Sequence, residues 1–504
     1  MEKKTISFFL LLFVTSVLFA QNKTVNIDCG GLEQALAGDY SFEAIKINGS
    51  MDVRDFACIN DNATSITSID LSDCVVKAYD TRNEQYMGIH THFEADVIPP
   101  SSFFGFTQLE SVVLPANLVA IGEGAFAGCV KLTSISGSAS LEKIDNYAFS
   151  GCEQLKVVEL PATLQMIGDY AFDKCNSIAN LDLSTCPRLV HIGTRAFAQN
   201  TALVSLSLPA SLNSIGDAAF AGCTKLKEIV LPQNLSNMGV GVFAACPDLQ
   251  RVDMSKCNIE KISPWTFSAC RLLQQVQLPQ SVSVIGEGAF SYCESMHNIM
   301  LPMSVGELQG FAFAGCSSLM AISFMPEGVE EIGRYAFYHN TSVTETIIPT
   351  TVSYIDDHAF DGCINSANFY SLRELPAELG EMVFANIEVE NKILNVQIAS
   401  IPIYEGMDQW QDFGSIIAAT NIEDVENRSD IEVMFEQYDL KITSLQEMSE
   451  VRLYDTSGMM LSYTEPHLCQ AIVDTHAFVS NIYLLQVTTV DGRQTVLKVA
   501  RVIR

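Results

Sequence analysis

Basic residues are few in this chain of 504 residues, where 29 Lys and Arg stand against 59 Asp and Glu and the formal net charge is −30 at pH 7. Nucleic acids and anionic membranes bind proteins through basic surfaces, so this charge argues against both as partners. It favours solubility and, at most, a basic or calcium-assisted partner. Charged residues of both signs make up only 17 % of the chain, against 48 % hydrophobic residues. This composition excludes bulk disorder and supports a large buried core.

Long apolar runs are absent after residue 20, and a helix that spans a bilayer needs about 20 apolar residues. The one apolar run, 6–19, follows Lys3 and Lys4 and ends at Ala20. This order is typical of a secretory signal peptide over 1–20. The alternative is a retained membrane helix, for which the run is short. We expect an exported protein with no transmembrane segment after signal cleavage.

Motifs of enzymatic chemistry are also missing. The sequence contains no G-x-S-x-G, P-loop or H-E-x-x-H motif and no zinc-spaced C-x-x-C pair, so we expect no catalytic residues and no cofactor. The densest group of potential metal ligands is His90, His92, Glu94 and Asp96. On an extended chain His90 and His92 face the same side. One alternative is therefore a metal-dependent hydrolase that uses His90, His92 and Asp96, and the other is a solvated loop without metal.

One unit recurs along most of the chain, and 215–232 is a clear copy of it. A Phe stands in one column at steps of 23 to 25 residues, and an aliphatic residue stands five positions before it from the second copy onward. A fixed period in this range is the signature of a solenoid, in which each unit buries its apolar face by stacking on its neighbours. The repeat core that we predict consists of Phe126, Phe149, Phe172, Phe197, Phe220, Phe243, Phe267, Phe290, Phe313, Phe337 and Phe360.

Each unit also carries Leu-x-x-Val/Ile-x-Leu, often closed by Pro, as in 155–161. The alternation predicts a short strand with one face inward, and Pro ends the strand. The second half of the unit, Ile-Gly-x-x-Ala-Phe, places a Gly where we expect a tight bend, with Phe filling the interior behind it. Successive strands should pair in parallel about 4.8 Å apart. The sequence therefore predicts a β-rich solenoid of about 13 units.

The repeated Leu-Pro, Ile-Gly, Ala-Phe and Gly-Cys pairs resemble the BspA-like class of bacterial leucine-rich repeats over about 22–417. The resemblance implies a right-handed open solenoid on a cell-surface or secreted protein, with adhesion or host-protein binding in some members. It also implies an aromatic-rich closing unit, which 396–417 matches with Tyr404, Trp410 and Phe413. The alternative for this stretch is a linker with stray aromatic residues.

On this basis we divide the chain after the signal peptide into a cap, an array and a closing part. The N-terminal leucine-rich cap covers 21–100, because a solenoid end needs an atypical unit over its apolar cross-section. The array covers 101–387, the C-terminal cap 388–420 and a linker 421–430.

Cysteines number 15, an odd count for an exported chain. Nine of them stand three residues after the column Phe: Cys129, Cys152, Cys175, Cys223, Cys246, Cys270, Cys293, Cys316 and Cys363. Asn200 and Asn340 hold this place in two other units. Leucine-rich repeats use Cys or Asn where a small side chain turns inward and bonds the backbone, so we interpret the nine as buried thiols. The alternatives are a metal site or a disulfide ladder, and parallel Cβ vectors on adjacent turns are poor disulfide geometry.

Six cysteines lie outside this column. Cys74, Cys186 and Cys257 form a lesser column of the same kind, and Cys29, Cys58 and Cys469 are left over. A Cys29–Cys58 bridge is one way to pin the N-terminal cap.

After residue 430 the pattern changes to short alternating stretches separated by Gly or Asp, which predicts a small antiparallel β-sandwich over 431–504. This region resembles the type A C-terminal sorting domain of the type IX secretion system. The residues that carry the resemblance are Tyr454-Asp455-x-x-Gly458, Ile482-Tyr483-x-Leu485 and the basic end 498–504. Asn481 stands where that family usually has Gly. The resemblance implies secretion machinery as a partner and the outer surface or exterior of a Gram-negative bacterium; the alternative is a plain accessory β-domain.

The positions that the repeat leaves free are the outward side chains of the strands. They are polar and acidic in the middle of the array and become more apolar towards its C-terminal end, where a patch often marks a contact site. Our candidate ligand-binding residues are Asp253, Gln277, Met300, Met320, Ile347 and Tyr370. We predict a non-enzymatic protein that binds a protein or glycan ligand in adhesion or host interaction. A structural surface-layer spacer and the metal-dependent hydrolase remain the alternatives, and the sequence does not identify a ligand.

Overall fold

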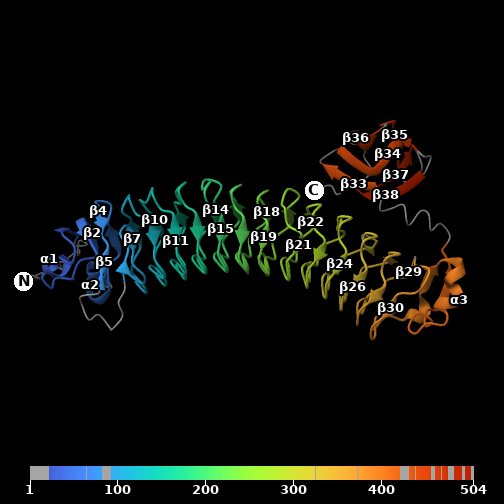
Figure 1. Ribbon diagram of the computed structural model, residues 1–504, viewed down its shortest axis with the longest axis horizontal. Helices are drawn as coiled ribbons and strands as arrows, with labels where there is room; N and C mark the ends of the chain where they lie inside the picture. The colour runs from blue at the N-terminus through green and yellow to red at the C-terminus, as the bar shows by residue number, and fades with distance from the viewer. Residues whose placement is uncertain are drawn as a thin grey trace, which may run out of the picture. The chain divides into compact units, whose positions relative to one another are not determined.

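The computed structural model (Figure 1) describes most of the chain after the predicted signal peptide. The described residues are 22–63, 65–81, 92–323, 325–371, 373–419, 431–436, 439–455, 460–466, 468–474, 482–490 and 494–500. The predicted signal peptide and the linker 421–430 therefore lie outside them. The chain divides into two compact units, and the boundary between them falls inside the predicted array. Unit 1 is 1–252 with 256–258, and unit 2 is 253–255 with 259–504. In the part that the structure describes, no helix has the length and apolarity needed to span a membrane.

The N-terminal cap is built into the solenoid's first sheet. Its elements are β1 (Asn22–Ile27), α1 (Leu32–Leu36), β2 (Ala44–Met51), α2 (Val53–Asn62), β3 (Ser68–Asp70), β4 (Cys74–Val76), β5 (Tyr79–Asp80), β6 (His92–Phe93) and β7 (Val97–Ile98). Asp52 and Asp55 form a capping box that starts α2. Strands β1, β2 and β3 pair in parallel, and β3 pairs with the first array strand, β8 (Ser111–Val113). The cap therefore presents paired backbone, not an open edge, to the array.

The Leu-x-x-Val-x-Leu segments form the predicted parallel strands, which we call the first ladder and which pair in separate short sheets along the array. After β8 its strands are β10 (Ser134–Ser136), β12 (Val157–Val158), β14 (Asn180–Asp182), β16 (Ser205–Ser207), β18 (Glu228–Val230), β20 (Arg251–Asp253), β22 (Gln275–Gln277), β25 (Ala321–Ile322), β27 (Glu345–Ile348), β29 (Asn368–Ser371), β31 (Ile393–Val396) and β32 (Ser415–Ala418). The register keeps repeat positions aligned, as in Ser111↔Ser134↔Val157. The β-rich solenoid predicted from the sequence is confirmed.

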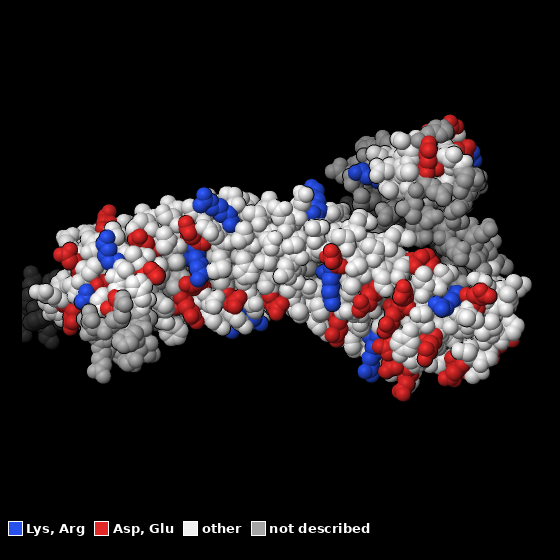
Figure 2. All heavy atoms as spheres, in the orientation of Figure 1, with Lys and Arg blue, Asp and Glu red and all other residues white. Residues whose placement is uncertain are grey.

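A second parallel ladder, which the sequence analysis did not predict, forms at the Ile of Ile-Gly. In unit 1 it comprises β7, β9 (Ala120–Ile121), β11 (Lys143–Ile144), β13 (Met166–Ile167), β15 (His191–Ile192), β17 (Ser214–Ile215) and β19 (Asn237–Met238). In unit 2 it comprises β21 (Lys261–Ile262), β23 (Val284–Ile285), β24 (Glu307–Leu308), β26 (Glu331–Ile332), β28 (Tyr354–Ile355) and β30 (Glu378–Leu379). Figure 2 shows acidic side chains gathered over the later turns of unit 2. In this ladder Glu307 and Glu331 are exposed and each precedes a buried aliphatic residue.

The Gly after this Ile is needed for space and not for a flexible bend. A Cβ on Gly168 would lie 2.7 Å from the backbone nitrogen of Asn146, one turn earlier, and a Cβ on Gly333 would lie 2.7 Å from the nitrogen of Gly310. Real Cβ atoms essentially never come this close. The sequence predicts a tight bend at this Gly, and the close stacking of successive turns explains why no larger residue fits there.

The column Phe side chains stack face to face through the core. In unit 1 the ring centroids are 5.0 Å apart at Phe103–Phe126 and 5.6 Å apart at Phe220–Phe243. In unit 2 the spacing is 5.5 Å at Phe267–Phe290. The eleven predicted core residues are each 0–1 % exposed. Burial of each Phe contributes about 1.5–3 kcal/mol, so this spine is a major source of stability.

The cysteine column is buried and hydrogen-bonded, as predicted. Cys129 Sγ lies 3.1 Å from the carbonyl oxygen of Phe103, and Cys223 Sγ lies 3.4 Å from that of Phe197. Asn200 makes the equivalent bond, donating from Nδ2 to the Phe172 oxygen at 2.8 Å. Burial raises the pKa of the Cys246 thiol to about 12, so this thiol is protonated and unreactive at neutral pH.

The remaining cysteines form no disulfide bond either. Cys29 and Cys58 are both unpaired and half-buried, so the proposed bridge between them is absent. Cys58 Sγ instead lies 3.7 Å from the Tyr40 hydroxyl. Cys469 is free and exposed on the C-terminal domain.

The aromatic closing unit is a packed cap. It contains η2 (Val389–Asn391), η3 (Ile398–Ser400) and α3 (Ile401–Tyr404). Tyr404 and Trp410 are fully buried and Phe413 is 5 % exposed. Tyr404 shares a hydrogen bond of 2.6 Å with the Ser371 hydroxyl, and burial raises the pKa of its phenol to about 12. The aromatic residues therefore cover the last turn of the solenoid and are not stray residues of a linker.

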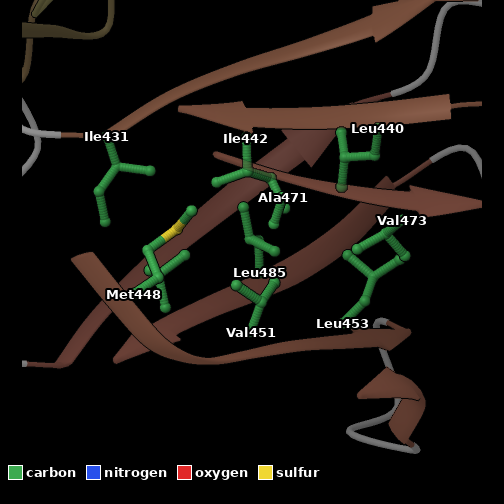
Figure 3. Close-up of a cluster of buried hydrophobic side chains, with 10 residues drawn as sticks. Ile431, Leu440, Ile442, Met448, Val451, Leu453, Ala471, Val473 and Leu485 are labelled. Atoms are coloured by element: carbon green, nitrogen blue, oxygen red, sulfur yellow. The ribbon is translucent and has the colours of Figure 1, made fainter. Parts of the chain in front are cut away.

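The C-terminal domain is an antiparallel sheet, as the alternating pattern predicted. Its strands are β33 (Ile431–Glu436), β34 (Asp439–Asp455), β35 (Met460–Thr464), β36 (Leu468–Asp474), β37 (Ile482–Thr489) and β38 (Gln494–Ala500). The first half of β34 pairs with β33 and β36, and the second half pairs with β35 and β37. Register shifts near Met448 mark the change of partners, so the sheet turns on itself. Its core includes Leu440, Val451, Leu453 and Leu485 (Figure 3).

The described residues that resemble a sorting domain lie at the adjoining ends of two interior strands of this sheet. Tyr454 and Asp455 end β34, and Ile482 and Tyr483 begin β37. Gly458, Asn481 and the terminal residues 501–504 lie outside the described residues.

Candidate functional site

Three of the predicted ligand-binding residues are exposed at the strand positions of the repeat, with Gln277 in β22, Met320 directly before β25 and Met300 in a segment that forms no strand. Gln277 ends β22 and is exposed, while Met300 and Met320 are 48 % and 58 % exposed. The backbone behind Met320 is held on both sides, because its N–H donates to the His297 oxygen and its oxygen accepts from the Thr344 N–H. Flexible apolar side chains on a fixed backbone suit binding, since Met adapts to irregular partners.

Asp253 has a local structural role. Its carboxylate accepts hydrogen bonds from the backbone N–H of Ser255 at 3.0 Å and from the Ser255 hydroxyl at 2.7 Å. Asp182 makes the same pair of bonds with Ser184. The Asp-x-Ser sequence therefore closes the turn after the strand, which explains the residue without a ligand.

Ile347 is not on the surface, and the expectation that it projects from the face is wrong. It is 8 % exposed, and its neighbours Thr346 and Ile348 are fully buried. In the register it pairs with Tyr370 on the next strand, so a much larger side chain stands beside it in the same column and shields it from water. Tyr370 itself is half-buried.

Exposed apolar residues are not confined to the C-terminal end of the face. In unit 1 Val157, Val204 and Val230 are 52 %, 38 % and 63 % exposed. The apolar character of the face is therefore not limited to its C-terminal end. The face also carries an exposed ion pair, Glu228 with Arg251 at 2.9 Å, which contributes little to stability.

The predicted metal cluster is only partly described, because His90 lies outside the described residues. His92 is exposed on β6, with its ring nitrogens 3.7 Å from Asp80 and 3.6 Å from Glu94. The Asp96 carboxylate accepts a hydrogen bond from the Asn117 side-chain amide. Across the described ranges, no group of three or more His, Cys, Asp and Glu is placed to hold a metal ion.

A shallow hollow lies along the second ladder of unit 1. It has a volume of about 920 Å³ and is lined by polar residues that include His191, Asn213 and Asn258. The His191 Nδ1 lies 2.7 Å from the Ser214 hydroxyl, so these two groups satisfy each other. Apart from Val190 and Cys257 the lining is polar, whereas small-molecule sites are usually lined mostly by apolar side chains.

The structure also reveals an outer aromatic row that sequence reasoning missed. The residue two positions before the column Phe has left-handed backbone in every described turn of the array, with φ of 58° at Tyr147 and 56° at Tyr170. Bulky residues rarely adopt this conformation. It is held because each N–H then donates to the next turn, as Tyr147 does to the Asp169 oxygen at 2.8 Å. The signal was visible in the sequence as Tyr, Trp, Phe and His at one position of a segment that we assigned to a bend.

The pattern that builds these ladders is the one described by a known family model. The model for the BspA-type leucine-rich repeat region, with six copies, matches residues 89–189, 190–320, 285–407 and 330–428. The chain belongs to the BspA-type leucine-rich repeat family. The match covers both ladders of this BspA-type solenoid and its aromatic cap, and it ends before the C-terminal sheet.

Solved structures of bacterial leucine-rich repeat proteins are similar to this BspA-type chain. A leucine-rich repeat protein from Bacteroides ovatus is 24 % identical, with 66 % of this chain and 89 % of that chain covered and a TM-score of 0.47. A leucine-rich cell surface protein from Faecalibacterium prausnitzii is 21 % identical, with 69 % and 86 % covered and a TM-score of 0.34. The leucine-rich repeat protein of T. pallidum is 31 % identical, with 36 % and 78 % covered and a TM-score of 0.30. No curated protein matches the chain at significant similarity.

Proposed function

We propose that this BspA-type protein is exported and binds a protein or glycan ligand at the cell surface or outside the cell, without catalysing a reaction. The observation that carries the proposal is the pair of large apolar side chains Met300 and Met320, which are 48 % and 58 % exposed, with the Met320 backbone hydrogen-bonded on both sides. Exposed apolar groups on a rigid face mark contact sites. Adhesion or host interaction is the role that such a face would serve.

Replacement of both Met300 and Met320 by Ser should weaken binding at least tenfold, or about 1.4 kcal/mol. Ser removes the apolar contact that an interface hot spot would bury and leaves the backbone ladder intact. The measurement is binding of the full chain to immobilised extracellular-matrix proteins and mucin glycans by surface plasmon resonance. Met407→Ser is the matched control, because Met407 is 40 % exposed in the C-terminal cap, away from this face.

Two results would count against this proposal. If the unaltered chain binds none of the immobilised matrix proteins and mucin glycans, the alternative of a structural spacer is favoured. If Met407→Ser weakens binding as much as the double variant does, the ligand does not use the outward face.

We also propose that 431–504 directs export, as the resemblance to a type IX sorting domain implies, which places the protein on a Gram-negative cell. Its support is an independently packed sheet with its own core of Leu440, Val451, Leu453 and Leu485. Deletion of 431–504 should leave the solenoid inside the cell envelope, as measured by fractionation and immunoblotting in the native host. Equal export of the truncated and full-length chains would leave the plain accessory domain as the better reading.

A further inference from the structure

The outer aromatic row of unit 1 ends at Tyr147. The Tyr147 and Tyr170 rings are stacked with centroids 4.8 Å apart and planes inclined by 10°. On the far side of this pair, the Arg195 guanidinium lies over the Tyr170 ring at 5.5 Å. On the near side, the same position of the preceding turn holds Gly124, which has no side chain. One face of Tyr147 is therefore covered by Tyr170 and the other borders an empty place in the row.

This empty place is a notch of about 490 Å³, which we call the Gly124 notch. Gly124, Ala127 and Gly128 of one turn form its floor, while Phe104 and Tyr147 belong to the turns on either side. The two aromatic residues are unusually exposed, at 62 % and 42 %. A pocket of this size with aromatic walls and few polar groups has the usual character of a ligand site.

The space above Gly124 is open, in contrast to the space above Gly288, one of the other glycines at the same position of the repeat. A Cβ on Gly124 would meet only the Ser101 hydroxyl at 3.8 Å and the Ala127 Cβ at 4.0 Å. At Gly288 in unit 2 the Trp265 ring already occupies the corresponding space, because a Cβ there would lie 2.8 Å from Trp265 Cδ2. The Trp265 ring thus fills the space above Gly288, whereas the space above Gly124 is unfilled.

The width of the notch suits one planar group. The core rings of these three turns are 5.0 Å and 5.2 Å apart, so the turns that carry Phe104 and Tyr147 are separated by about 10 Å. A group midway lies about 5 Å from each flanking turn. Tyr170 stacks on the other face of Tyr147 at a similar spacing of 4.8 Å, and a cation is attracted to an aromatic face within roughly 6 Å.

The charges around the notch favour a cation. Glu123 lies in its lining and is exposed, and none of the described lining residues is basic. The chain as a whole carries a net charge of −30. Arginine already stacks on rings of the outer aromatic row. The Arg195 guanidinium lies over the Tyr170 ring, and the Arg334 guanidinium lies over the Tyr335 ring at 5.2 Å.

We propose that the Gly124 notch binds an arginine side chain of a basic polypeptide, with the guanidinium between Phe104 and Tyr147 and paired with Glu123. Arginine is favoured over lysine because its planar fork stacks on rings and pairs with a carboxylate through two hydrogen bonds. The bound guanidinium continues the row Tyr147–Tyr170–Arg195 at its open end. This site lies apart from the outward sheet face, so it stands whether or not that face binds a ligand.

The test uses the full chain and an acetylated, amidated Gly-Arg-Gly-Arg-Gly peptide, with its lysine counterpart, in isothermal titration calorimetry. We expect the arginine peptide to bind at least fivefold more tightly than the lysine peptide. Gly124→Tyr should weaken arginine binding at least tenfold, because it fills the notch. This variant should fold, since Tyr147 and Tyr170 occupy the same left-handed position.

Two further variants separate the notch from general electrostatic attraction. Tyr147→Gly removes one wall of the notch, and Gly readily adopts the φ of 58° found at this position. This variant should also abolish the preference for arginine. Tyr292→Gly is the matched control, because Tyr292 is 51 % exposed with φ of 58° elsewhere in the array, and it should leave binding unchanged.

Several outcomes would overturn the proposal. Absence of arginine binding, equal affinity for the lysine peptide, or binding unaffected by Gly124→Tyr would each do so. Capture of chito-oligosaccharides that Gly124→Tyr abolishes would assign the notch to a sugar ring instead. The double variant of Met300 and Met320 should bind the arginine peptide normally, so failure of the proposed sheet-face function is distinguishable from failure here.

Discussion

Phe220→Ala is expected to lower the free energy of unfolding of its part of the solenoid by about 3–5 kcal/mol, as core Phe truncations do. The Phe220 ring is fully buried between those of Phe197 and Phe243, at 5.5 Å and 5.6 Å. The neighbouring turns cannot collapse into the cavity, because the Phe220 N–H donates to the Val242 oxygen at 2.9 Å and fixes the spacing. Urea denaturation of the full chain followed by circular dichroism measures the loss.

Glu159→Ala is the control for this prediction. Glu159 is exposed beyond β12 on the outward face, so its truncation should change stability by no more than about 0.5 kcal/mol. Since a repeat array need not unfold in a single step, the comparison is made on the first transition that Phe220→Ala shifts. Equal shifts for the two variants would mean that the repeat faces the opposite way.

The core could be predicted from the sequence because every turn of the solenoid needs side chains of the same size and polarity at the same buried positions. Phe220 and Cys223 each touch their equivalents one turn away, so the same residue types recur at a fixed spacing. The second ladder could not be predicted in this way. Its strands, such as Ser214–Ile215, contain two residues, and alternation needs about four or more to be recognised.

The candidate sites were harder to predict because exposure depends on neighbouring turns. Ile347 fits an outward position of the repeat, but Tyr370 on the next strand shields it. The Gly124 notch is defined by a missing side chain between Phe104 and Tyr147, which are 43 residues apart in the sequence. The repeat alignment shows the column, but only the structure shows that one gap is open and that Trp265 fills another.

Trp410→Ala is expected to destabilise the C-terminal end of the solenoid by about 3–5 kcal/mol. Trp410 is fully buried and its ring lies 5.4 Å from those of both Phe384 and Tyr404. Its Nε1–H donates to the Ala377 oxygen at 3.1 Å, and Ala377 is itself buried. The variant therefore opens a cavity and leaves a carbonyl without its partner, which adds to the cost. Thermal unfolding followed by circular dichroism should show an earlier first transition.

Trp410→Phe separates the cost of the cavity from the cost of the lost hydrogen bond to Ala377. It keeps most of the apolar contact with Phe384 but removes the donor to Ala377, so it should cost about 1–3 kcal/mol, the penalty for an unsatisfied buried group. Ile398→Ala, at a side chain that is 75 % exposed in the same cap, should stay within about 0.5 kcal/mol. If Trp410→Ala behaved like Ile398→Ala, the aromatic unit would not stabilise the last turn. The apolar end of the spine at Phe384 would then need another cover, because a solenoid without a cap exposes its core cross-section to water.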